Sequence, residues 1–470
     1  MFHHTQFMLD QFAPIALYQK LKNAFENEIT FLFESAGSSG GKNSIVLIGA
    51  RERLQYRDGV TRYTNAKGET EAVDASPFDF LKTYYSKIDT APYKEVCKAL
   101  DIGYADGFIG YIGYDMVKVF EPVLQTYMEN LDDPMGIPDL DLILPKLVAV
   151  YSHTNHKITL LTTQKQMAAR FDALEADIKG EYAYTPLVPM RNDEGGAFAF
   201  SKKRFFEMVA DSKAMIKSGD VFQILMTNRY TRKAQVDPFS FYRILRTKNP
   251  SPYMYLLEYE DFAIVGSSPE VMVRLHENEL LLRPIAGTRK RGATKERDRE
   301  LEEELLADPK ELAEHLMLID LGRNDVGRVA KTGTVKVEDM MHIERYSHVM
   351  HIVSDVTAQL REDKDMFDLF MATFTAGTMT GAPKIRAMEL IAEFEGLKRG
   401  FYSGAIGYFG FDGNMDSAIT IRTSLVKPGE VILQAGAGIV DDSQPELEYL
   451  EVQNKLGALM SSLEDLKLDN

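Results

Sequence analysis

Two pairs of glutamates, far apart in the chain, restrict how this sequence can fold. Glu311 and Glu314 lie in the segment DPKELAEHLMLIDLGRND. Glu448 and Glu451 repeat the spacing in PELEYLEVQNKLGAL. A spacing of three residues places both carboxylates of a pair on one face of a helix, and two such helices face to face form an all-oxygen pocket suited to Mg²⁺. The alternative is a charged face in solvent, because Asp-Pro-Lys-Glu is also a good helix start.

The length and composition indicate a large globular protein. With 470 residues the chain exceeds the usual size of one hydrophobic core, so we expect two domains or one large layered domain. Apolar residues make up 45% of the chain, and no apolar run approaches the roughly 18 residues of a membrane span. The first residues, MFHHTQFMLDQF, lack the pattern of a secretory signal. We therefore expect a cytoplasmic protein with no membrane partner.

Charge and cysteine content argue against two classes of function. The formal net charge of −16 disfavours nucleic acid as a partner, and the one basic run, Arg289 to Arg291, is expected to be a solvated loop. Cys97 is the only cysteine, which excludes an internal disulfide and a cysteine-rich metal site. It also lacks a glycine-flanked turn, so we expect it to pack as an apolar side chain rather than act as a nucleophile.

The pattern of apolar residues predicts an α+β fold. Residues 1–190 contain short strand-like segments such as SIVLIGA and end in a polar linker with several prolines. An amphipathic helix is expected between a serine cap at Ser201 and Gly219. Beyond it, long strand-like segments alternate with turns and helices, which favours antiparallel sheets stacked around a cleft.

Several segments have the chemistry of an anion site. TAGTMTGAPK, residues 375–384, is a loop of small residues whose backbone amides can cradle a carboxylate or a phosphate. Gly436, Ala437 and Gly438 let a ligand approach bare backbone amides. Arg422 falls within the predicted strand AITIRTSLV, where it is either exposed or a bidentate clamp for a carboxylate. His351 shares a predicted strand face with packed valines, so a hydrogen-bonded core histidine is the alternative to a functional one.

The amino-acid sequences of these segments, and their order along the chain, resemble those of one family. The segments that carry the resemblance are SSPE, RPIAGT, KELAEHLMLIDLGRND, YSHVMHIVSDV, FTAGTMTGAPKIRAMELI, FYSGAIGYF, IRTSLV, QAGAGIVDDSQPELEY and NKLGAL. Together they are similar to the chorismate-binding enzymes, and among these to the large subunit, component I, of anthranilate synthase. The resemblance implies two stacked, largely antiparallel orthogonal β-sheets flanked by helices around a central cleft. It also implies an N-terminal region at 1–190 with tryptophan-binding regulatory elements and a chorismate-binding catalytic domain at 196–465.

The resemblance assigns a cofactor and a substrate site. It places Mg²⁺ between Glu314 and Glu451, with Glu311 and Glu448 as supports, where the cation would bind the ring carboxylate of chorismate. The residues implied to bind the rest of the substrate are Tyr402, Arg422, Gly436, Ala437 and Gly438 at the second carboxylate, with Gly287, Thr288 and Thr378 lining the remaining site.

The implied catalytic residues are Glu270, His351 and Thr378. Glu270, in SSPE, would protonate the departing C4 hydroxyl as ammonia adds at C2. His351 would assist the loss of pyruvate that makes the ring aromatic. The implied activity is that of a lyase at the first step of tryptophan biosynthesis.

Two positions distinguish the branches of this family. Isochorismate and salicylate synthases carry a lysine base where this chain has Gln223, and an amide cannot accept a proton at neutral pH. Aminodeoxychorismate synthases mostly carry a nucleophilic lysine where this chain has Ala286. Both residues favour direct addition of ammonia, with aminodeoxychorismate synthase component I as the alternative. A non-catalytic tryptophan-binding regulator is the alternative from another class.

Two partners follow from the resemblance. The chain has no cysteine suited to a glutaminase, so a separate glutamine amidotransferase subunit, component II, is implied as the source of ammonia in a hetero-oligomer. FES with Ser35 and the segment Pro252-Tyr253-Met254 resemble the two halves of an L-tryptophan site that gives feedback inhibition. The first motif has Phe33 where the family has a leucine.

Overall fold

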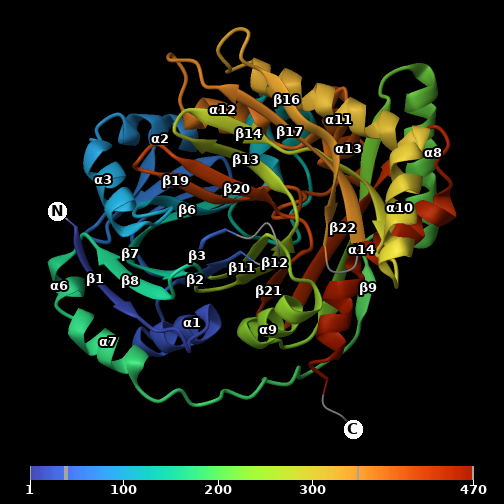
Figure 1. The fold of residues 1–470 in the computed structure, drawn as a ribbon. Coiled ribbons are helices and arrows are strands. Elements are labelled where there is room, and N and C mark those ends of the chain that lie inside the picture. The colour runs from blue at the N-terminus through green and yellow to red at the C-terminus, as the bar shows by residue number, and fades with distance from the viewer. Residues whose placement is uncertain (1, 36–40, 347–348, 468–470) are drawn as a thin grey trace.

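The computed structural model describes residues 2–35, 41–346 and 349–467. Every ladder between its named strands is antiparallel, and helices lie on the outside, as the α+β prediction requires (Figure 1). The strands form two arrays that share β3 (Asn43–Arg57) and β7 (Leu140–Ser152).

The first array contains the N-terminal half of β3 and the C-terminal half of β7, which pair with each other. In order of hydrogen bonding, its other strands are β1 (His3–Met8), β8 (Lys157–Thr162), β2 (Thr30–Glu34), β11 (Tyr253–Glu258), β12 (Ala263–Ser268), β21 (Thr423–Lys427), β22 (Glu430–Ile439) and β10 (Gln223–Lys233), with β9 (Gly196–Phe198) and β18 (Gly381–Ala382) beside β10.

The second array contains the C-terminal half of β3 and the N-terminal half of β7. Its strands are β5 (Thr70–Val73), β4 (Val60–Thr64), β6 (Gly107–Ile112), β19 (Ala405–Gly410), β20 (Met415–Ile419), β13 (Val271–His276), β14 (Glu279–Leu282) and β17 (Val349–Gln359), with β15 (Ile285–Lys290) and β16 (Lys336–Arg345) beside β17.

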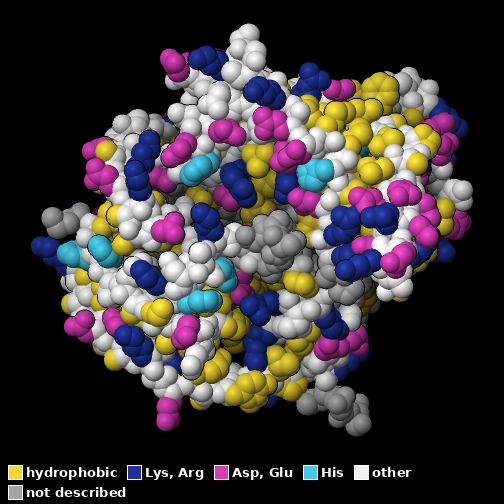
Figure 2. Space-filling model, in the orientation of Figure 1, with side chains coloured by type: hydrophobic (Ala, Val, Ile, Leu, Met, Phe, Trp, Pro, Cys, Tyr) yellow, Lys and Arg dark blue, Asp and Glu magenta, His cyan; other side chains and the backbone are white. Residues whose placement is uncertain are grey.

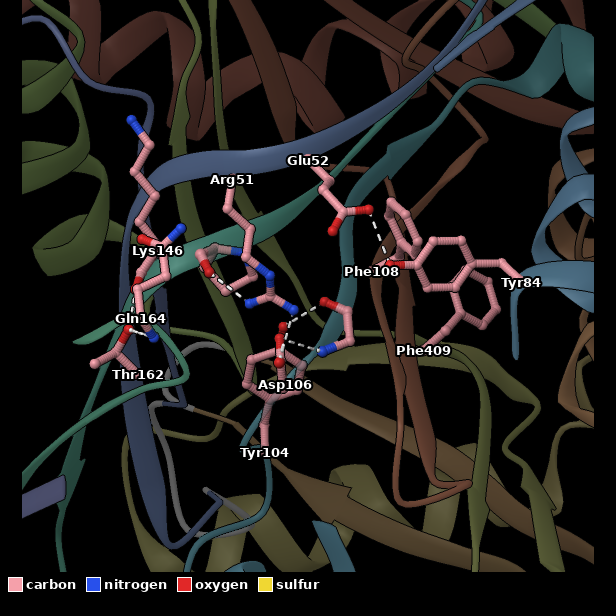
Figure 3. Close-up of polar contacts among 12 residues, drawn as sticks. Arg51, Glu52, Tyr84, Tyr104, Asp106, Phe108, Lys146, Thr162, Gln164 and Phe409 are labelled. Carbon is pink, nitrogen blue, oxygen red and sulfur yellow. Dashed lines mark hydrogen bonds and ion pairs between the residues drawn. The ribbon is translucent and has the colours of Figure 1, made fainter. Parts of the chain in front are cut away.

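The two arrays meet at a bend in β3. The register of β3 against β7 shifts between Ala50 and Glu52, which is the signature of a β-bulge, and bulges bend strands. The bulged residue, Arg51, donates to the Pro145 carbonyl at 2.8 Å and to the Asp106 carboxylate at 2.7 Å (Figure 3). This ion pair ties β3 to the start of β6 and fixes the point at which the strands pass from one array to the other.

Side-chain alternation produces the stacked arrangement. On β11, Tyr255 and Leu257 contribute to a core that also contains Ile109 and Ile406 of the second array, whereas Leu256 contributes to a core shared with the helices. Neighbouring side chains on a strand point to opposite faces of the sheet. The first array therefore lies between the second array and a helical layer, which confirms the predicted stacking.

Helices cover both outer faces. Their bounds are α1 (Pro14–Ala24), α2 (Pro77–Tyr85), α3 (Ala91–Leu100), α4 (Val117–Phe120), α5 (Gln125–Met128), α6 (Lys165–Ala168), α7 (Phe171–Lys179), α8 (Lys202–Ser218), α9 (Pro238–Lys248), α10 (Lys295–Ala307), α11 (Pro309–Gly327), α12 (Met366–Thr373), α13 (Lys384–Glu395) and α14 (Pro445–Glu464), with 3₁₀ turns at Tyr114–Met116, Pro122–Leu124 and Gly377–Met379. Figure 1 shows α8, α10, α11 and α14 at one end of the arrays and α2 and α3 at the other. In the described parts of the chain, no helix combines the length and the apolar composition needed to span a membrane.

The helix expected before Gly219 forms as predicted. The Ser201 hydroxyl accepts from the Arg204 N–H at 3.2 Å, and Gly219 ends α8 in the left-handed conformation with φ of 84°. The two predicted regions, 1–190 and 196–465, are hydrogen-bonded to each other, because β2 pairs with β11 and β6 pairs with β19. Their division into domains stays a prediction.

Candidate active site

Glu270 lies between β12 and β13, where both its backbone and its side chain are held. Its carbonyl accepts from the Ile419 N–H at 3.0 Å, and the Thr378 hydroxyl donates to its carboxylate at 3.1 Å. Only 8% of the residue is exposed. Burial raises the pKa of Glu270 to about 7, against the opposing effects of the Thr378 hydroxyl and the positive charges of Arg422 and Lys455. A carboxyl with this pKa holds a proton near neutral pH and can donate it.

Arg422 lies in a turn and not within a strand. The predicted strand AITIRTSLV is broken into β20 and β21, and Arg422 lies between them with a φ of 51°, which is outside the extended region of regular strands. The Ser267 N–H donates to its carbonyl at 3.1 Å. Its guanidinium makes no ion pair with any residue that the structure describes, and its charge interacts with Tyr402, Glu270 and Glu451. A guanidinium with its donors free suits a carboxylate ligand.

Gly436 to Gly438 lie on the part of β22 that is paired on one edge. β10 pairs with β22 as far as Ile439, whereas the ladder with β21 ends at Leu433. The Tyr402 hydroxyl lies beside the Gly436 amide. Ala437 offers only its backbone to this edge, since its side chain is buried in the helix-side core. A Cβ at Gly438 would approach the Gln223 amide nitrogen to 2.7 Å, so the Gln223 side chain lies directly against this glycine.

His351, Gly287 and Thr288 are brought together by the ladder of β15 and β17. A register shift between Ala286 and Thr288 leaves Gly287 with a φ of 63°. The His351 Nδ1 lies 3.0 Å from the Gly287 carbonyl and 3.1 Å from the Thr288 hydroxyl. A carbonyl only accepts, so Nδ1 carries the proton and Nε2 is left as an acceptor. Burial lowers the pKa of His351, which keeps the ring neutral.

Glu311 and Glu314 share one face of α11 as predicted, but Glu311 does not complete a capping box. Asp308 caps the helix by accepting from the Lys310 and Glu311 N–H groups. The Glu311 carboxylate instead accepts from Arg289 at 3.0 Å, and Arg289 also donates to Asp308 at 2.8 Å.

The basic run is therefore not the solvated loop that was expected. Arg289 lies in β15 and pairs with Asp308 and Glu311 at the start of α11. Arg291 pairs with Asp298 of α10 at 2.8 Å. On the face of the molecule in Figure 2, Lys and Arg side chains are interspersed with Asp and Glu.

The four glutamates are neighbours without forming a ligand set. Burial raises the pKa of Glu314, and the negative charges of Glu311 and Glu451 raise it further. Glu451 pairs with Lys455 of its own helix, α14, at 2.6 Å. Within the described ranges, no three His, Cys, Asp or Glu side chains are arranged to hold a metal ion. Mutually repelling carboxylates have the donor chemistry for Mg²⁺, and the magnesium site stays a prediction.

Lys455 is a site residue that the sequence reasoning missed. Its ammonium donates to the Gly436 carbonyl at 2.9 Å and pairs with Glu451. Its positive charge also acts to lower the pKa of Glu270 and of Glu314. The available signal was its position four residues after Glu451, which is the spacing of a helical ion pair. That spacing is common on solvent-exposed helices and does not by itself indicate a functional lysine.

The two branch-distinguishing residues are both buried. Gln223 is 6% exposed, lies against Gly438, and has a side-chain oxygen with no hydrogen-bond partner among the described residues. Ala286 is 9% exposed and pairs with Ile352 in the ladder of β15 and β17.

A separate cavity of about 440 Å³ lies between the two arrays. Its lining includes Ser35, Pro252, Tyr253 and Met254. The Tyr253 hydroxyl donates to Asp416 at 2.9 Å and accepts from Arg274 at 2.9 Å, so this wall is polar as well as aromatic. Met254 borders the cavity, but it also belongs to the helix-side core.

This cavity adjoins the residues next to Glu270 and His351. Pro269 and Val271, on either side of Glu270, line it. Tyr346 also lines it, and its ring lies 5.5 Å from the His351 ring at an angle of 63°. A ligand in the cavity would therefore press on neighbours of both residues.

Comparisons with known proteins identify the family. A family model for the chorismate binding enzyme matches residues 38–461. The chain is 40% identical to anthranilate synthase component 1 of Aquifex aeolicus, over 98% of this chain and 94% of that protein. It is 41% identical to anthranilate synthase component 1 of Acinetobacter calcoaceticus, with the same coverage.

Solved structures agree with the sequence comparisons. Anthranilate synthase component I from Streptococcus pneumoniae superposes with a TM-score of 0.77 at 33% identity, covering 90% of this chain and 93% of that one. The menaquinone-specific isochorismate synthase from Escherichia coli gives a TM-score of 0.72 at 18% identity, covering 98% and 95%, which shows a shared fold. The chain therefore belongs to the chorismate binding enzyme family, and within it to the group of anthranilate synthase component 1 proteins.

Proposed function

We propose that this chain is the large subunit of an anthranilate synthase, which converts chorismate and ammonia to anthranilate and pyruvate. The observation that carries the proposal is Glu270, a buried carboxyl with a pKa of about 7 that is held by Thr378 near Arg422, whose guanidinium has no ion-pair partner among the described residues. An acid that can protonate a leaving hydroxyl next to a cation that can bind a carboxylate matches the first step on chorismate.

The remaining site residues have compatible roles. Arg422, Tyr402 and the amides of residues 436–438 bind the enolpyruvyl carboxylate, and Gly287 and Thr288 line the ring. Glu270 gives its proton to the C4 hydroxyl, which leaves as water while ammonia bonds to C2. In the second step His351, with Nε2 as an acceptor, assists removal of the C2 proton and the departure of pyruvate.

Ammonia is the nucleophile that the site favours over water. Gln223 offers a buried carbonyl oxygen with no partner among the described residues, which accepts a hydrogen bond but cannot deprotonate water. Ala286 cannot form a covalent adduct. Both residues favour the ortho product, anthranilate, over isochorismate and 4-amino-4-deoxychorismate.

Mg²⁺ is the cofactor in this proposal. Glu314 and Glu451 would hold it, with Glu311 and Glu448 as supports, and it would supply positive charge to the ring carboxylate of chorismate. The support is that these carboxylates raise one another's pKa: Glu451 raises that of Glu448 as well as that of Glu314.

Ammonia comes from a glutamine amidotransferase subunit in this proposal. The name component 1, borne by the relatives, refers to a protein with more than one component. Burial raises the pKa of Cys97 to about 12, so this thiol cannot serve as a glutaminase nucleophile. The chain alone should use ammonium salts but not glutamine.

L-Tryptophan is the proposed inhibitor and the cavity of about 440 Å³ its site. Ser35, directly after β2, and Tyr253, on the neighbouring strand β11, offer polar and aromatic contacts. Inhibition follows from the shared wall, because a ligand that displaces Pro269, Val271 or Tyr346 also displaces Glu270 or His351.

Product identification tests the activity. The purified chain is incubated with chorismate, Mg²⁺ and an ammonium salt at alkaline pH, and the products are separated by chromatography. We expect anthranilate and pyruvate in equal amounts, and little isochorismate or salicylate when ammonium is left out. Formation of 4-amino-4-deoxychorismate alone, or rapid isochorismate formation without ammonium, would overturn the assignment.

A further inference from the structure

A small cavity borders Glu270, and Val271 and Arg283 line both it and the larger cavity that we assign to tryptophan. Its volume is about 30 Å³, and its polar lining residues are Glu270, Arg283, Asp325, Thr373 and Thr378. A water molecule needs roughly 10–15 Å³ and two to four polar partners. The cavity therefore meets both conditions for a bound water that contacts the buried acid.

Asp325 connects this cavity to the surface. It is 8% exposed on α11 and accepts from Lys384 at 2.5 Å, and Lys384 leads into α13 from the loop that contains Thr378. The side chain of Lys384 is 11% exposed, which gives solvent a route to the pair. The other charges that act on Asp325 are those of Arg328 and Glu121, which pair with each other at 2.9 Å.

We propose that Asp325 is a proton-relay residue, which returns a proton to Glu270 through a water in this cavity after each turnover. The inference rests on the proposed function, since it takes Glu270 as the general acid. In the first step the Glu270 O–H bond breaks and its proton leaves with the C4 oxygen as water. The carboxylate then takes a proton from the cavity water, which takes one from Asp325, which takes one from solvent at the Lys384 side. One proton moves at each transfer and no electrons are exchanged.

The surroundings of Glu270 make such a route necessary. The groups facing its carboxylate are the Thr378 hydroxyl and the charges of Arg422 and Lys455, and Tyr346 lies nearby. With chorismate bound against Arg422, the substrate side of Glu270 is covered. The cavity provides access to the carboxylate from the other side.

Two variants and one control test the relay. Asp325→Asn removes the group that transfers the proton. Gly322→Ala fills the cavity without touching the ion pair, because a Cβ at Gly322 would lie 3.1 Å from Leu282 and 3.7 Å from Pro284, both of which line the cavity. Gly327→Ala is the matched control on the same helix, since a Cβ there meets nothing within 4 Å.

The measurement compares the first turnover with the steady state. At pH 6, below the pKa of Glu270, the enzyme starts with its acid protonated. In rapid-quench experiments with Mg²⁺ and ammonium, we expect Asp325→Asn and Gly322→Ala to complete the first turnover at the wild-type rate. Their steady-state kcat should fall roughly 10- to 100-fold, with KM for chorismate unchanged and a larger loss at pH 8. Gly327→Ala should match the wild type in both.

A structural role for Asp325 predicts a different result. If Asp325→Asn slows the first turnover and the steady state equally, or if Gly322→Ala keeps full steady-state activity, the relay is wrong. Because Asp325→Asn leaves Lys384 without its partner, the double variant with Lys384→Met repeats the test with the charge removed, and the relay predicts the same loss of kcat. A wild type that makes no anthranilate would overturn the proposed function instead.

Discussion

The two halves of the site differ in how completely they are assembled. Glu270 accepts from Thr378, and His351 contacts Gly287 and Thr288, so these side chains are held by neighbours in the fold. On α11 and α14, in contrast, two of the four glutamates are paired with the protein's own cations, Glu311 with Arg289 and Glu451 with Lys455.

This difference separates proton transfer from metal binding. The acid lies between β12 and β13, and the loop of Thr378 is tied to β10 by the Leu225 N–H, which donates to the Thr380 carbonyl, so its geometry comes with the fold. The glutamates lie on two separate helices, and a divalent cation has to replace Lys455 at Glu451. We therefore expect proton-transfer variants to act in all conditions and metal-site variants to depend on the Mg²⁺ concentration.

The largest effect is expected for Glu270→Gln. The amide keeps the shape of the side chain but cannot donate a proton as an acid, so kcat should fall roughly 10²- to 10⁴-fold at every Mg²⁺ concentration. Steady-state assays of anthranilate formation measure it. Glu362→Gln, an exposed carboxylate between β17 and α12, is the control and should be unaffected. If added Mg²⁺ restored the kcat of Glu270→Gln, the residue would be shown to act through the metal.

A somewhat smaller and conditional effect is expected for Glu314→Gln and Glu451→Gln. Each removes a charge that the cation needs, so turnover at ordinary Mg²⁺ should fall roughly 10²-fold or more. Mg²⁺ at ten times its Kd should raise the melting temperature of the wild type by about 1–2 °C, and should not raise that of either variant.

Glu446→Gln, in the first turn of α14, is the control for the metal site and should respond to Mg²⁺ as the wild type does. Near-normal turnover of Glu314→Gln or Glu451→Gln at ordinary Mg²⁺ would refute the assignment of these residues to the metal.

A regulatory effect of 5- to 150-fold is expected at the larger cavity. By linkage, tryptophan and chorismate must weaken each other's binding by the same factor, and couplings between sites are typically of this size. Ser35→Arg should fill the cavity and remove inhibition while the uninhibited activity stays largely unchanged. Anthranilate formation is measured against tryptophan concentration, with Ser86→Arg at the exposed end of α2 as the control. Equal sensitivity of Ser35→Arg and the wild type would refute the site.

Local sequence rules predicted the elements of the fold but not all of the side-chain partners. The two ends of α8, at Ser201 and Gly219, were predicted correctly because helix capping depends on residues within one turn. Arg422 was placed in a strand because its neighbours alternate in polarity, and nothing in that pattern shows a positive φ. At this turn the Arg422 carbonyl accepts from the Ser267 N–H, which is distant in sequence.

The candidate site shows the same limit. Glu270, Thr378, Arg422 and Tyr402 come from separate segments that only the resemblance linked before the fold was known. Arg289 and Lys455 were missed because their roles depend on which helix end or strand edge lies beside them. Ion pairs between distant segments leave no periodic signal in the sequence.

The ionisation of Glu270 tests the central claim most directly. Its pKa is raised from an ordinary 4.5 to about 7 in the folded protein, so the folded state binds more protons than the unfolded state between these values. The free energy of unfolding of the wild type should therefore lose up to about 3 kcal/mol from this group as the pH rises from 4.5 through 7, and Glu270→Gln should lose none of it. We predict that Glu270→Gln gains stability relative to the wild type between pH 5 and pH 8, measured by urea unfolding. A difference between the two proteins that stays constant over this range would contradict an acid held protonated near neutral pH.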